Sequence, residues 1–228
     1  MSAHPLAGSV VAVVGASGAL GSRIAQGAAE RGADVVLVGR DAKRLAAVRA
    51  GVPVVVGDLS DVTLGERVVA AAIEHHGRLD GVVNAAGVVA FGPILETDDA
   101  VLEELFLTNV LGPLWLTRRA APALAESKGF LAQLSAVVAE QPLPGMAGYA
   151  ASKAALTAAD RALTRELRRS GIRVLDVRPP HTETGLAGRP LAGVAPRLPE
   201  GLDPDDVARR VLDAIEEGRS ELASTDFA

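Results

Sequence analysis

Residues 9–21, SVVAVVGASGALG, decide the fold of this chain. Ser9–Gly15 is an apolar, β-branched run with the length of a strand. Glycines at positions 15, 18 and 21 follow, and a helical pattern continues to about Arg31. In such a strand–turn–helix unit, glycines permit a tight turn and bring the backbone and the helix N-terminus against a pyrophosphate. The stretch predicts the first unit of a dinucleotide-binding domain, with a tight turn that binds no ligand as the alternative.

Outward from this stretch, short β-branched runs alternate with longer segments of helical period. Further strands are expected at residues 33–40, 52–59, 80–87, 130–136, 172–179 and 221–225. Further helices are expected after Asp41 and at about 61–76, 97–127, 149–169 and 204–217. Strict β–α alternation requires a parallel sheet with right-handed crossovers. We therefore expect one doubly wound α/β domain of Rossmann type over residues 1–228, with a parallel sheet of about seven strands flanked by helices.

Composition limits the classes of protein. Only 3% of the 228 residues are aromatic, so Val, Leu, Ile and Ala must pack the core, as in a sheet covered on both faces. A net charge of −5 without a long basic run argues against a nucleic-acid partner. The chain has no cysteine, which excludes thiolate chemistry, and no metal constellation is expected. Met1–Gly8 lacks the pattern of a signal peptide and no apolar stretch has membrane-spanning length, so we expect a soluble, cytoplasmic protein.

One segment breaks the alternation. Residues 185–202 are rich in Gly and Pro and have no periodicity, and we expect a substrate loop too short to be a second domain. With Val88–Gly92 and Leu143–Met146, this loop is expected to line a mostly apolar pocket in which Val89 and Leu143 contact substrate. A small, uncharged ketone, aldehyde or alcohol fits such a pocket better than a phosphorylated molecule.

The residue that ends the second strand selects between the two nicotinamide dinucleotides. An acidic side chain there accepts from a ribose 2′-hydroxyl, whereas an arginine neutralises a 2′-phosphate. The strand ends Gly39-Arg40, with no carboxylate before the arginine. Asp41 is the competing candidate, although it is well placed to cap the next helix. We favour NADP(H) and keep NAD(H) open, the alternative being that Arg40 is only a solvated surface charge.

A tyrosine and a lysine carry the expected chemistry. Tyr149 is the only tyrosine, and Lys153 follows it by four residues on a predicted helix, which puts both on one face. A free phenol has a pKa of about 10, too high for acid–base work near neutrality. A nearby ammonium, helped by a cationic nicotinamide, is expected to lower that pKa. Tyr149 could then exchange a proton with a substrate oxygen while hydride moves to or from the cofactor; the alternative is the start of a core helix with a solvated lysine.

The chain resembles the short-chain dehydrogenase/reductase family over nearly its whole length. Beyond the glycine turn, the matching stretches are Asp58-Leu59, Asn84-Ala85-Ala86-Gly87, Asn109, Tyr149-Ala-Ala-Ser-Lys153 and the segment from Pro179 to Thr184. The resemblance implies an oxidoreductase, a dimer or tetramer, whose proton relay includes Tyr149, Lys153 and Asn109. The cofactor-binding residues that it implies are Gly15, Ser17, Gly18, Leu20, Gly21, Arg40, Asp58, Leu59, Asn84, Ala85, Gly87, Tyr149, Lys153, Pro179, Thr182 and Thr184.

Three departures from the family pattern matter. The glycine turn reads G-x-x-G-x-x-G, where the shorter-chain branch of the family has G-x-x-x-G-x-G. The active-site serine is expected thirteen residues before Tyr149, where this chain has Ala136. Ser135 is kept as a catalytic candidate, although it faces the other side of the strand unless the strand ends early or bulges. His181 follows Pro179-Pro180 and is either a satisfied loop residue or a substrate contact that replaces the serine.

Three hypotheses about function follow. In the first, the protein is a working oxidoreductase in which Ser135, a rearranged loop or the substrate compensates for Ala136. In the second, it is a weakly active or inactive dinucleotide-binding sensor or partner subunit. In the third, it is an interaction protein without a nucleotide. The retained Tyr149, Lys153 and Asn109 favour the first hypothesis, and the glycine turn argues against the third.

Overall fold

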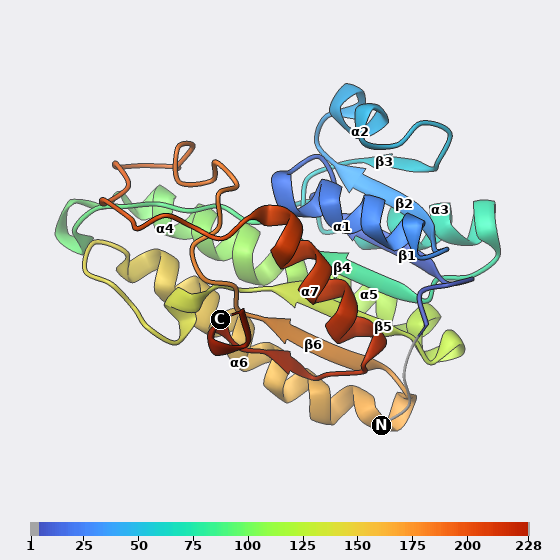
Figure 1. The fold of residues 1–228 in the computed structure, drawn as a ribbon. Coiled ribbons are helices and arrows are strands. Elements are labelled where there is room, and N and C mark those ends of the chain that lie inside the picture. The colour runs from blue at the N-terminus through green and yellow to red at the C-terminus, as the bar shows by residue number, and fades with distance from the viewer. Residues whose placement is uncertain (1–4, 228) are drawn as a thin grey trace.

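The computed structural model describes residues 5–227 as an α/β domain with one seven-stranded sheet in the order β3-β2-β1-β4-β5-β6-β7 (Figure 1). Every strand pairs with its neighbours in parallel. Met1–His4 and Ala228, which the predicted domain includes, lie outside the described residues. The prediction of a doubly wound parallel sheet flanked by helices is confirmed.

The strands and helices follow the predicted order. The strands are β1 Val10–Val14, β2 Asp34–Gly39, β3 Val54–Val56, β4 Gly81–Asn84, β5 Phe130–Leu134, β6 Arg173–Val177 and β7 Glu221–Leu222. The helices are α1 Ala19–Glu30, α2 Ala42–Val48, α3 Leu64–His76, α4 Asp99–Phe106, α5 Gly112–Ser127, α6 Ala147–Glu166 and α7 Pro204–Glu216. No helix among the described residues is long and apolar enough to cross a membrane.

Several predicted elements differ from the structure. The strands expected at 52–59 and 80–87, for example, are shortened to β3 and β4. The long helix expected at 97–127 is divided into α4 and α5 by a π-helical turn at Leu107–Leu111. The last strand is shorter than expected, because a 3₁₀ turn begins at Ser224. The apolar periodicity does not reveal the π turn, because such a turn changes the helical register by one residue and leaves the apolar pattern almost intact.

Local capping residues set the helix bounds. The side chain of Asp41 accepts hydrogen bonds from the N–H groups of Lys43 and Arg44, at 2.9 and 3.1 Å. Asp203 caps α7 in the same way, and Gly77 ends α3 in the left-handed conformation, at φ 75°. One carboxylate oxygen of Asp41 is therefore engaged as a helix cap, which is one of the two roles that the sequence left open.

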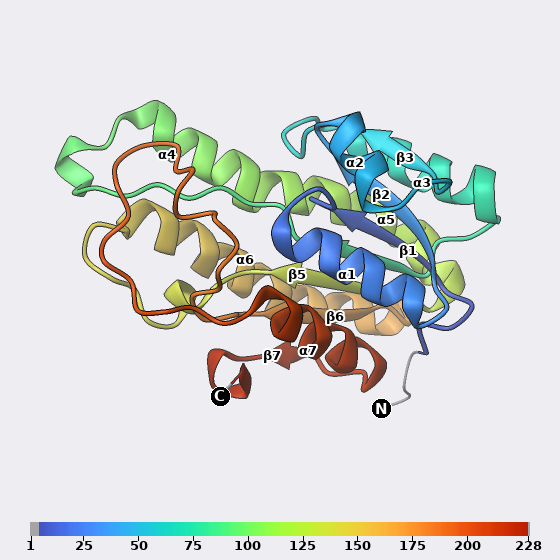
Figure 2. The same ribbon diagram turned by 45° about the horizontal axis from the view of Figure 1, so that its top comes forward.

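Helices cover both faces of the sheet. Apolar residues of α1 and α7 pack on one face, and those of α3 and α5 pack on the other (Figure 2). Every residue of β1, β4 and β5 is buried, which explains why these strands are apolar without alternation. The direction of winding reverses between β1 and β4, and ligands of open α/β sheets bind beyond the carboxyl ends of strands at such a point. Residues 185–202 extend beyond the same ends of the strands, near α4 (Figures 1 and 2).

Candidate functional site

A cavity of about 600 Å³ lies at the carboxyl edge of the sheet, where β1, β4, β5 and β6 end. Among the predicted site residues, those that line it are Gly15, Ser17, Gly18, Leu20, Arg40, Asp58, Leu59, Ala85, Gly87, Val89, Ser135, Leu143, Tyr149, Lys153, Pro179, His181, Thr182 and Thr184. Gly21, Asn84 and Asn109 do not line the cavity and instead support residues that do. One continuous space therefore connects residues that are far apart in the sequence.

The glycine turn lies at one wall of the cavity. Gly15 has φ 77°, and a Cβ atom there would come within 2.8 Å of the main-chain nitrogen of Ala86. A Cβ atom on Gly21 would overlap the carbonyl oxygen of Gly15, so α1 can start against β1 only with glycine at this position. The N-terminus of α1 has no side-chain cap and no acidic residue in its first turn. Its N–H groups and the positive end of its dipole therefore suit a phosphate.

Two arginines lie where the cavity passes the end of β2. The Arg40 side chain is 77% exposed, and its Nη1 lies 3.6 Å from Oδ2 of Asp58. Burial would raise the pKa of Asp58, but hydrogen bonds from Ser60 and the charge of Arg40 outweigh it and lower that pKa. Arg44 donates from Nη2 to the carbonyl oxygen of Ser17 at 2.8 Å and also lines the cavity. This end therefore has two guanidinium groups and one carboxylate.

Arg44 is not among the residues that the sequence predicted for the site. Its one signal was the spacing of four residues from Arg40, across the start of a helix capped by Asp41. Only the packing of α2 brings Arg44 back to the glycine turn, where it contacts Ser17.

Tyr149 and Lys153 lie on α6 and are 7% and 4% exposed. The Lys153 ammonium donates from Nζ to the carbonyl oxygen of Leu134, at the end of β5, at 2.8 Å. Burial lowers the pKa of Lys153 to about 8, against the opposing charges of Asp160 and Asp176. Lys153 is therefore held as a positioned cation near neutral pH.

The pKa of Tyr149 differs from the expectation. Burial raises the pKa of this phenol to about 12 in the protein alone, instead of the predicted lowering. Because the phenol is desolvated, its charged form is disfavoured, and the chain's own ammonium does not reverse this effect. At neutral pH the phenol carries its proton.

Asn109 lies in the π-helical turn between α4 and α5 and is 1% exposed. Its Oδ1 accepts from the N–H of Val88, while its Nδ2 donates to the carbonyl of Val88 at 2.9 Å and to Oγ of Ser152 at 3.0 Å. A Cβ atom built on Gly87 would be 3.2 Å from both Oδ1 of Asn109 and Nζ of Lys153. The π turn thus brings the amide into the same region as the ammonium, one layer below the cavity surface.

Asn84 supports the turn that follows β4. It is fully buried, its Oδ1 accepts from the N–H of Ala86, and its Nδ2 donates to Oε1 of Gln133 at 3.3 Å. This side chain fixes the main chain of residues 85–87 from beneath, so its effect on the cavity is indirect.

The hydroxyl of Ser135, which the sequence offers as a catalytic candidate, is engaged in contacts with α6. It donates to the carbonyl oxygen of Lys153 at 2.9 Å and lies 3.0 Å from Oγ1 of Thr157. Both contacts are buried between β5 and α6. The strand β5 is regular to Leu134, and successive side chains of an extended chain face opposite ways, so Ser135 and Ala136 point in different directions. Ala136 lines the cavity at the position of the family's serine and has no hydroxyl.

The apolar end of the cavity lies beneath residues 185–202. This segment pairs with residues 89–92, because the N–H of Leu191 donates to Val89 at 2.8 Å and the N–H of Phe91 donates to Ala192 at 2.9 Å. The apolar residues that line this end include Val89, Phe91, Val138, Leu143, Met146, Leu186 and Leu198. Arg189 lines the cavity too, while its Nε donates to Gly185.

His181 also lines the cavity. Its Nε2 lies 3.4 Å from Oε1 of Glu183, and Gly201 packs against its ring so closely that a Cβ atom there would be 2.8 Å from Cδ2. The ring is therefore held in place within the loop. No group of three or more His, Asp or Glu residues in the described part of the chain is arranged to hold a metal ion.

Comparisons with known proteins agree with this geometry. A family model described as short chain dehydrogenase matches residues 9–192. An uncharacterized oxidoreductase of Methylorubrum extorquens is 36% identical over 220 residues, which cover 89% of this chain and 88% of that protein. One from Staphylococcus saprophyticus is 32% identical and covers 91% of each chain. The crystal structure of a short chain dehydrogenase from Burkholderia cenocepacia in complex with NADP has a TM-score of 0.85 and 27% identity, covering 97% of this chain and 90% of that one.

Proposed function

Because the chain belongs to the short chain dehydrogenase family, we propose that it is an NADP(H)-preferring oxidoreductase that interconverts a small, uncharged ketone or aldehyde and its alcohol. The observation that carries the proposal is the single cavity that runs from the arginines at the end of β2, past the glycine turn, to Tyr149 and Lys153.

The residues of this cavity fit a nicotinamide dinucleotide. The N-terminus of α1 and the glycine turn would hold the pyrophosphate, since Gly15 and Gly18 leave the backbone N–H groups accessible. Asp58 and Leu59 would contact the adenine. The segment from Pro179 through Thr182 to Thr184 would contact the nicotinamide end. The solved relative from Burkholderia cenocepacia, which contains NADP, supports this assignment.

A preference for NADP(H) is supported by the charges at the end of β2. A 2′-phosphate would meet the guanidinium groups of Arg40 and Arg44, which suit bidentate hydrogen bonds to phosphate oxygens. Asp41 caps α2 through Oδ1 and is not among the residues that line the cavity, which argues against a role as ribose acceptor. Asp58 contributes one negative charge, which the two arginines exceed.

The bound cofactor would supply hydride transfer at its nicotinamide ring. Tyr149, which burial keeps protonated, would donate its phenol proton to the substrate oxygen during carbonyl reduction and take it back during alcohol oxidation. The Lys153 ammonium, fixed on Leu134, would stabilise the phenolate that forms and hold the nicotinamide ribose. Asn109 would act from below, by positioning the main chain of Val88 beside Lys153.

The lining of the substrate end supports an uncharged substrate of modest size. Val89 and Leu143 belong to a wall that is mainly aliphatic, and this wall would exclude water from the reacting atoms. His181 would contact the substrate from the loop, held in orientation by Glu183. Residues 185–202 would act as the substrate loop, because they close this wall by pairing with residues 89–92.

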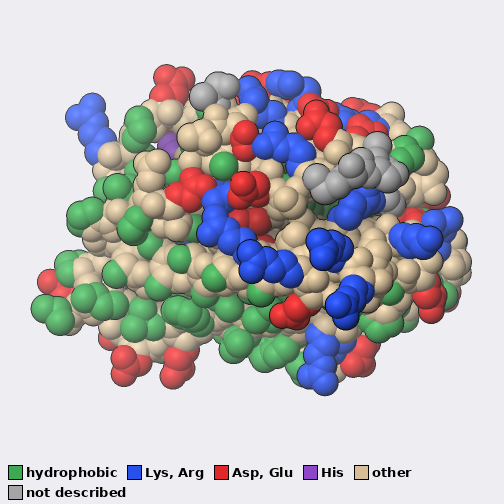
Figure 3. Space-filling model, turned by 90° about the horizontal axis from the view of Figure 1, so that it is seen from below, with side chains coloured by type: hydrophobic (Ala, Val, Ile, Leu, Met, Phe, Trp, Pro, Cys, Tyr) green, Lys and Arg blue, Asp and Glu red, His purple; other side chains and the backbone are tan. Residues whose placement is uncertain are grey.

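We further propose a homodimer or homotetramer that works in the cytoplasm, without a nucleic-acid or membrane partner. Exposed apolar side chains of Phe106 and Leu111, at 38% and 43%, lie where α4 continues into the π turn. On the face in Figure 3, hydrophobic side chains gather along the lower edge, while acidic and basic side chains mix over the rest. Light scattering after size exclusion tests the assembly, and cell fractionation tests the location.

The experiment that tests the function is hydride transfer across a panel of small ketones, aldehydes and alcohols with NADPH and with NADH. We expect turnover of an uncharged carbonyl with NADPH, and a loss of at least about a hundredfold in kcat for Tyr149→Phe. Quenching of Trp115 fluorescence measures NADPH binding independently.

If NADPH binds and no carbonyl is reduced, the protein is a dinucleotide-binding sensor or partner subunit; if NADPH does not bind, the proposal fails altogether. A strong preference for a polyanionic substrate would refute the substrate class.

A further inference from the structure

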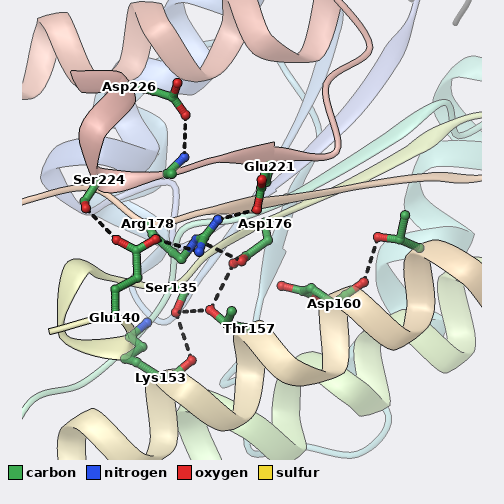
Figure 4. Close-up of polar contacts among 12 residues, drawn as sticks. Ser135, Glu140, Lys153, Thr157, Asp160, Asp176, Arg178, Glu221, Ser224 and Asp226 are labelled. Atoms are coloured by element: carbon green, nitrogen blue, oxygen red, sulfur yellow. Dashed lines mark hydrogen bonds and ion pairs between the residues drawn. The ribbon is translucent and has the colours of Figure 1, made fainter. Parts of the chain in front are cut away.

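A chain of buried polar groups lies between α6 and the sheet, one helical turn along α6 from Lys153 (Figure 4). It consists of Ser135 after β5, Thr157 on α6 and Asp176 on β6, which are 5%, 5% and 2% exposed. No part of the proposed chemistry uses Thr157 or Asp176. A polar chain in this position costs desolvation free energy, so its hydrogen bonds must be satisfied.

Three contacts join the chain to Lys153. Oδ1 of Asp176 lies 3.2 Å from Oγ1 of Thr157. The same Oγ1 lies 3.0 Å from Oγ of Ser135. Oγ of Ser135 lies 2.9 Å from the carbonyl oxygen of Lys153. All four atoms are oxygens, so each contact needs one proton to be a hydrogen bond. The two hydroxyls bring one proton each and the carbonyl brings none. A third proton, required to satisfy all three contacts, can come only from the carboxyl group of Asp176.

The surroundings of Asp176 raise its pKa, although the hydrogen bond from Thr157 and the positive charges nearby act in the opposite direction. Arg178, which is 3% exposed, forms its short ion pairs with Glu140 and Glu221, both at 2.6 Å. Its Nε forms a third ion pair, with Oδ2 of Asp176 at 3.1 Å, although the two atoms do not have the geometry of a hydrogen bond. One guanidinium charge is thus shared among three carboxylates. Burial raises the pKa of Asp176, as does the charge of Glu221, its partner in the β6–β7 register.

The charged and titratable groups that face Asp176 come from every element packed against it. They are Arg178 on β6, Glu221 on β7, Glu140 after β5, and Arg161, Asp160 and Lys153 on α6. The positive charges of Arg178 and Arg161 oppose the effect of burial and do not overcome it.

We propose that Asp176 is a positioning residue for Lys153, and that its protonation sets the direction of the hydrogen-bond chain through Thr157 and Ser135. With a neutral Asp176 the chain runs from the acid to Thr157, to Ser135 and onto the carbonyl oxygen of Lys153. With an ionised Asp176, Thr157 turns its proton to the carboxylate, because a carboxylate is the stronger acceptor. Ser135 then divides its single proton between Thr157 and the Lys153 carbonyl, which weakens the bond to Lys153.

The neutral state fixes Lys153 at both ends. Its Nζ donates to Leu134 and its carbonyl accepts from Ser135, two adjacent residues at the end of β5. This double contact holds one turn of α6 against β5 and so sets where the ammonium lies beneath Gly87. Ionisation of Asp176 weakens one of the two contacts, so Lys153 is then positioned less firmly.

The kinetic test rests on the proposed function and compares the pH profile of kcat in two variants. Asp176→Asn keeps a donor toward Thr157 at every pH, and Thr157→Val cuts the connection without changing any charge. We expect both to move the alkaline loss of kcat to higher pH, and Ser135→Ala to lower kcat about fivefold at every pH with little change in KM. Thr164→Val is the matched control, because Thr164 donates to a main-chain carbonyl of the same helix away from the site; its profile should equal that of the wild type.

The opposite shift decides against the proposal. If Asp176 acts only as a negative charge that keeps Lys153 protonated, Asp176→Asn moves the alkaline limb to lower pH and Thr157→Val leaves it unchanged. Melting temperatures of all variants check that each is folded.

An infrared measurement needs no substrate and therefore separates this proposal from the proposed function. The carbonyl band of a protonated carboxylic acid, recorded on the purified protein near neutral pH, should lose intensity in Asp176→Asn. Asp160→Asn identifies the contribution of the other buried acid, since burial raises the pKa of Asp160 to about 8. If Asp176→Asn removes no acid band, Asp176 is ionised and the proposal is overturned.

Discussion

Replacing Ala136 with serine tests whether a missing hydroxyl limits the rate of this enzyme. Ala136 lines the cavity with φ −168° and ψ 162°, an extended conformation that serine adopts as readily as alanine. The neighbouring Val137 donates its N–H to Pro179 at 2.9 Å, which holds the backbone in place. The new side chain therefore enters the cavity without a change in the main chain.

The expected gain follows from two opposing contributions. A donor preorganised toward a developing oxyanion stabilises the transition state by about 2.7–4 kcal/mol. A new serine without supporting hydrogen bonds populates three χ1 wells, and selecting the productive one costs about 0.6 kcal/mol. The difference predicts that Ala136→Ser raises kcat roughly 30- to 300-fold.

Steady-state reduction of the best carbonyl substrate with NADPH measures the effect. Val137→Thr is the matched control, because it adds a hydroxyl to the next residue of the same wall at almost constant volume, and its kcat should change by less than about threefold. An unchanged or lower kcat in Ala136→Ser, with the protein folded, would refute the reasoning. It would mean that another group already polarises the carbonyl.

Further predictions concern the cofactor, the buried ammonium and the glycine turn. Arg44→Ala and Arg40→Ala should each weaken NADPH binding by about tenfold and leave NADH binding unchanged, as measured by fluorescence quenching; equal losses for both cofactors would exclude a contact with the 2′-phosphate. Because burial lowers the pKa of Lys153 from 10.5 to about 8, the unfolded chain binds more protons between these values. The wild type should gain up to about 3 kcal/mol of stability from pH 8 to 10.5 relative to Lys153→Met in denaturant titrations. Gly15→Ala should lower the melting temperature more than Gly8→Ala, since both have positive φ but only Gly15 faces main chain within 3 Å. Backbone strain alone predicts about 2–8 °C for Gly8→Ala, and equal shifts in the two variants would contradict the clash.

The sequence predicted most of the fold because its signals are local. Apolar runs gave the strands, helical periodicity gave the helices, and Asp41 and Gly77 set helix ends through hydrogen bonds and conformations of their own neighbourhoods. The prediction of helices failed where the chain departs from a regular α-helix. The π turn that contains Asn109 keeps the apolar pattern of a continuous helix, so spacing alone could not show it.

Candidate site residues were predicted where residue type and position in the sequence are enough to identify them. They were missed where their place in the cavity depends on packing. Tyr149 and Lys153 follow from spacing on one helix, and Ala136 follows from counting back along the chain. Arg44 required the packing of α2 against the glycine turn. The raised pKa of Tyr149 required its burial, which depends on residues far away in sequence.

By itself the sequence determined the order of strands and helices, the turn at Gly15 and the set of residues at the carboxyl edge, because these depend on neighbours within a few positions. Tertiary structure alone decided which groups meet. It joined the hydroxyl of Ser135 to Lys153 and Thr157, and Thr157 to Asp176, and it paired the loop at 185–202 with residues 89–92. The physical reason is that side-chain direction, desolvation and hydrogen-bond partners are set by elements that crossovers bring together, and no local pattern records them.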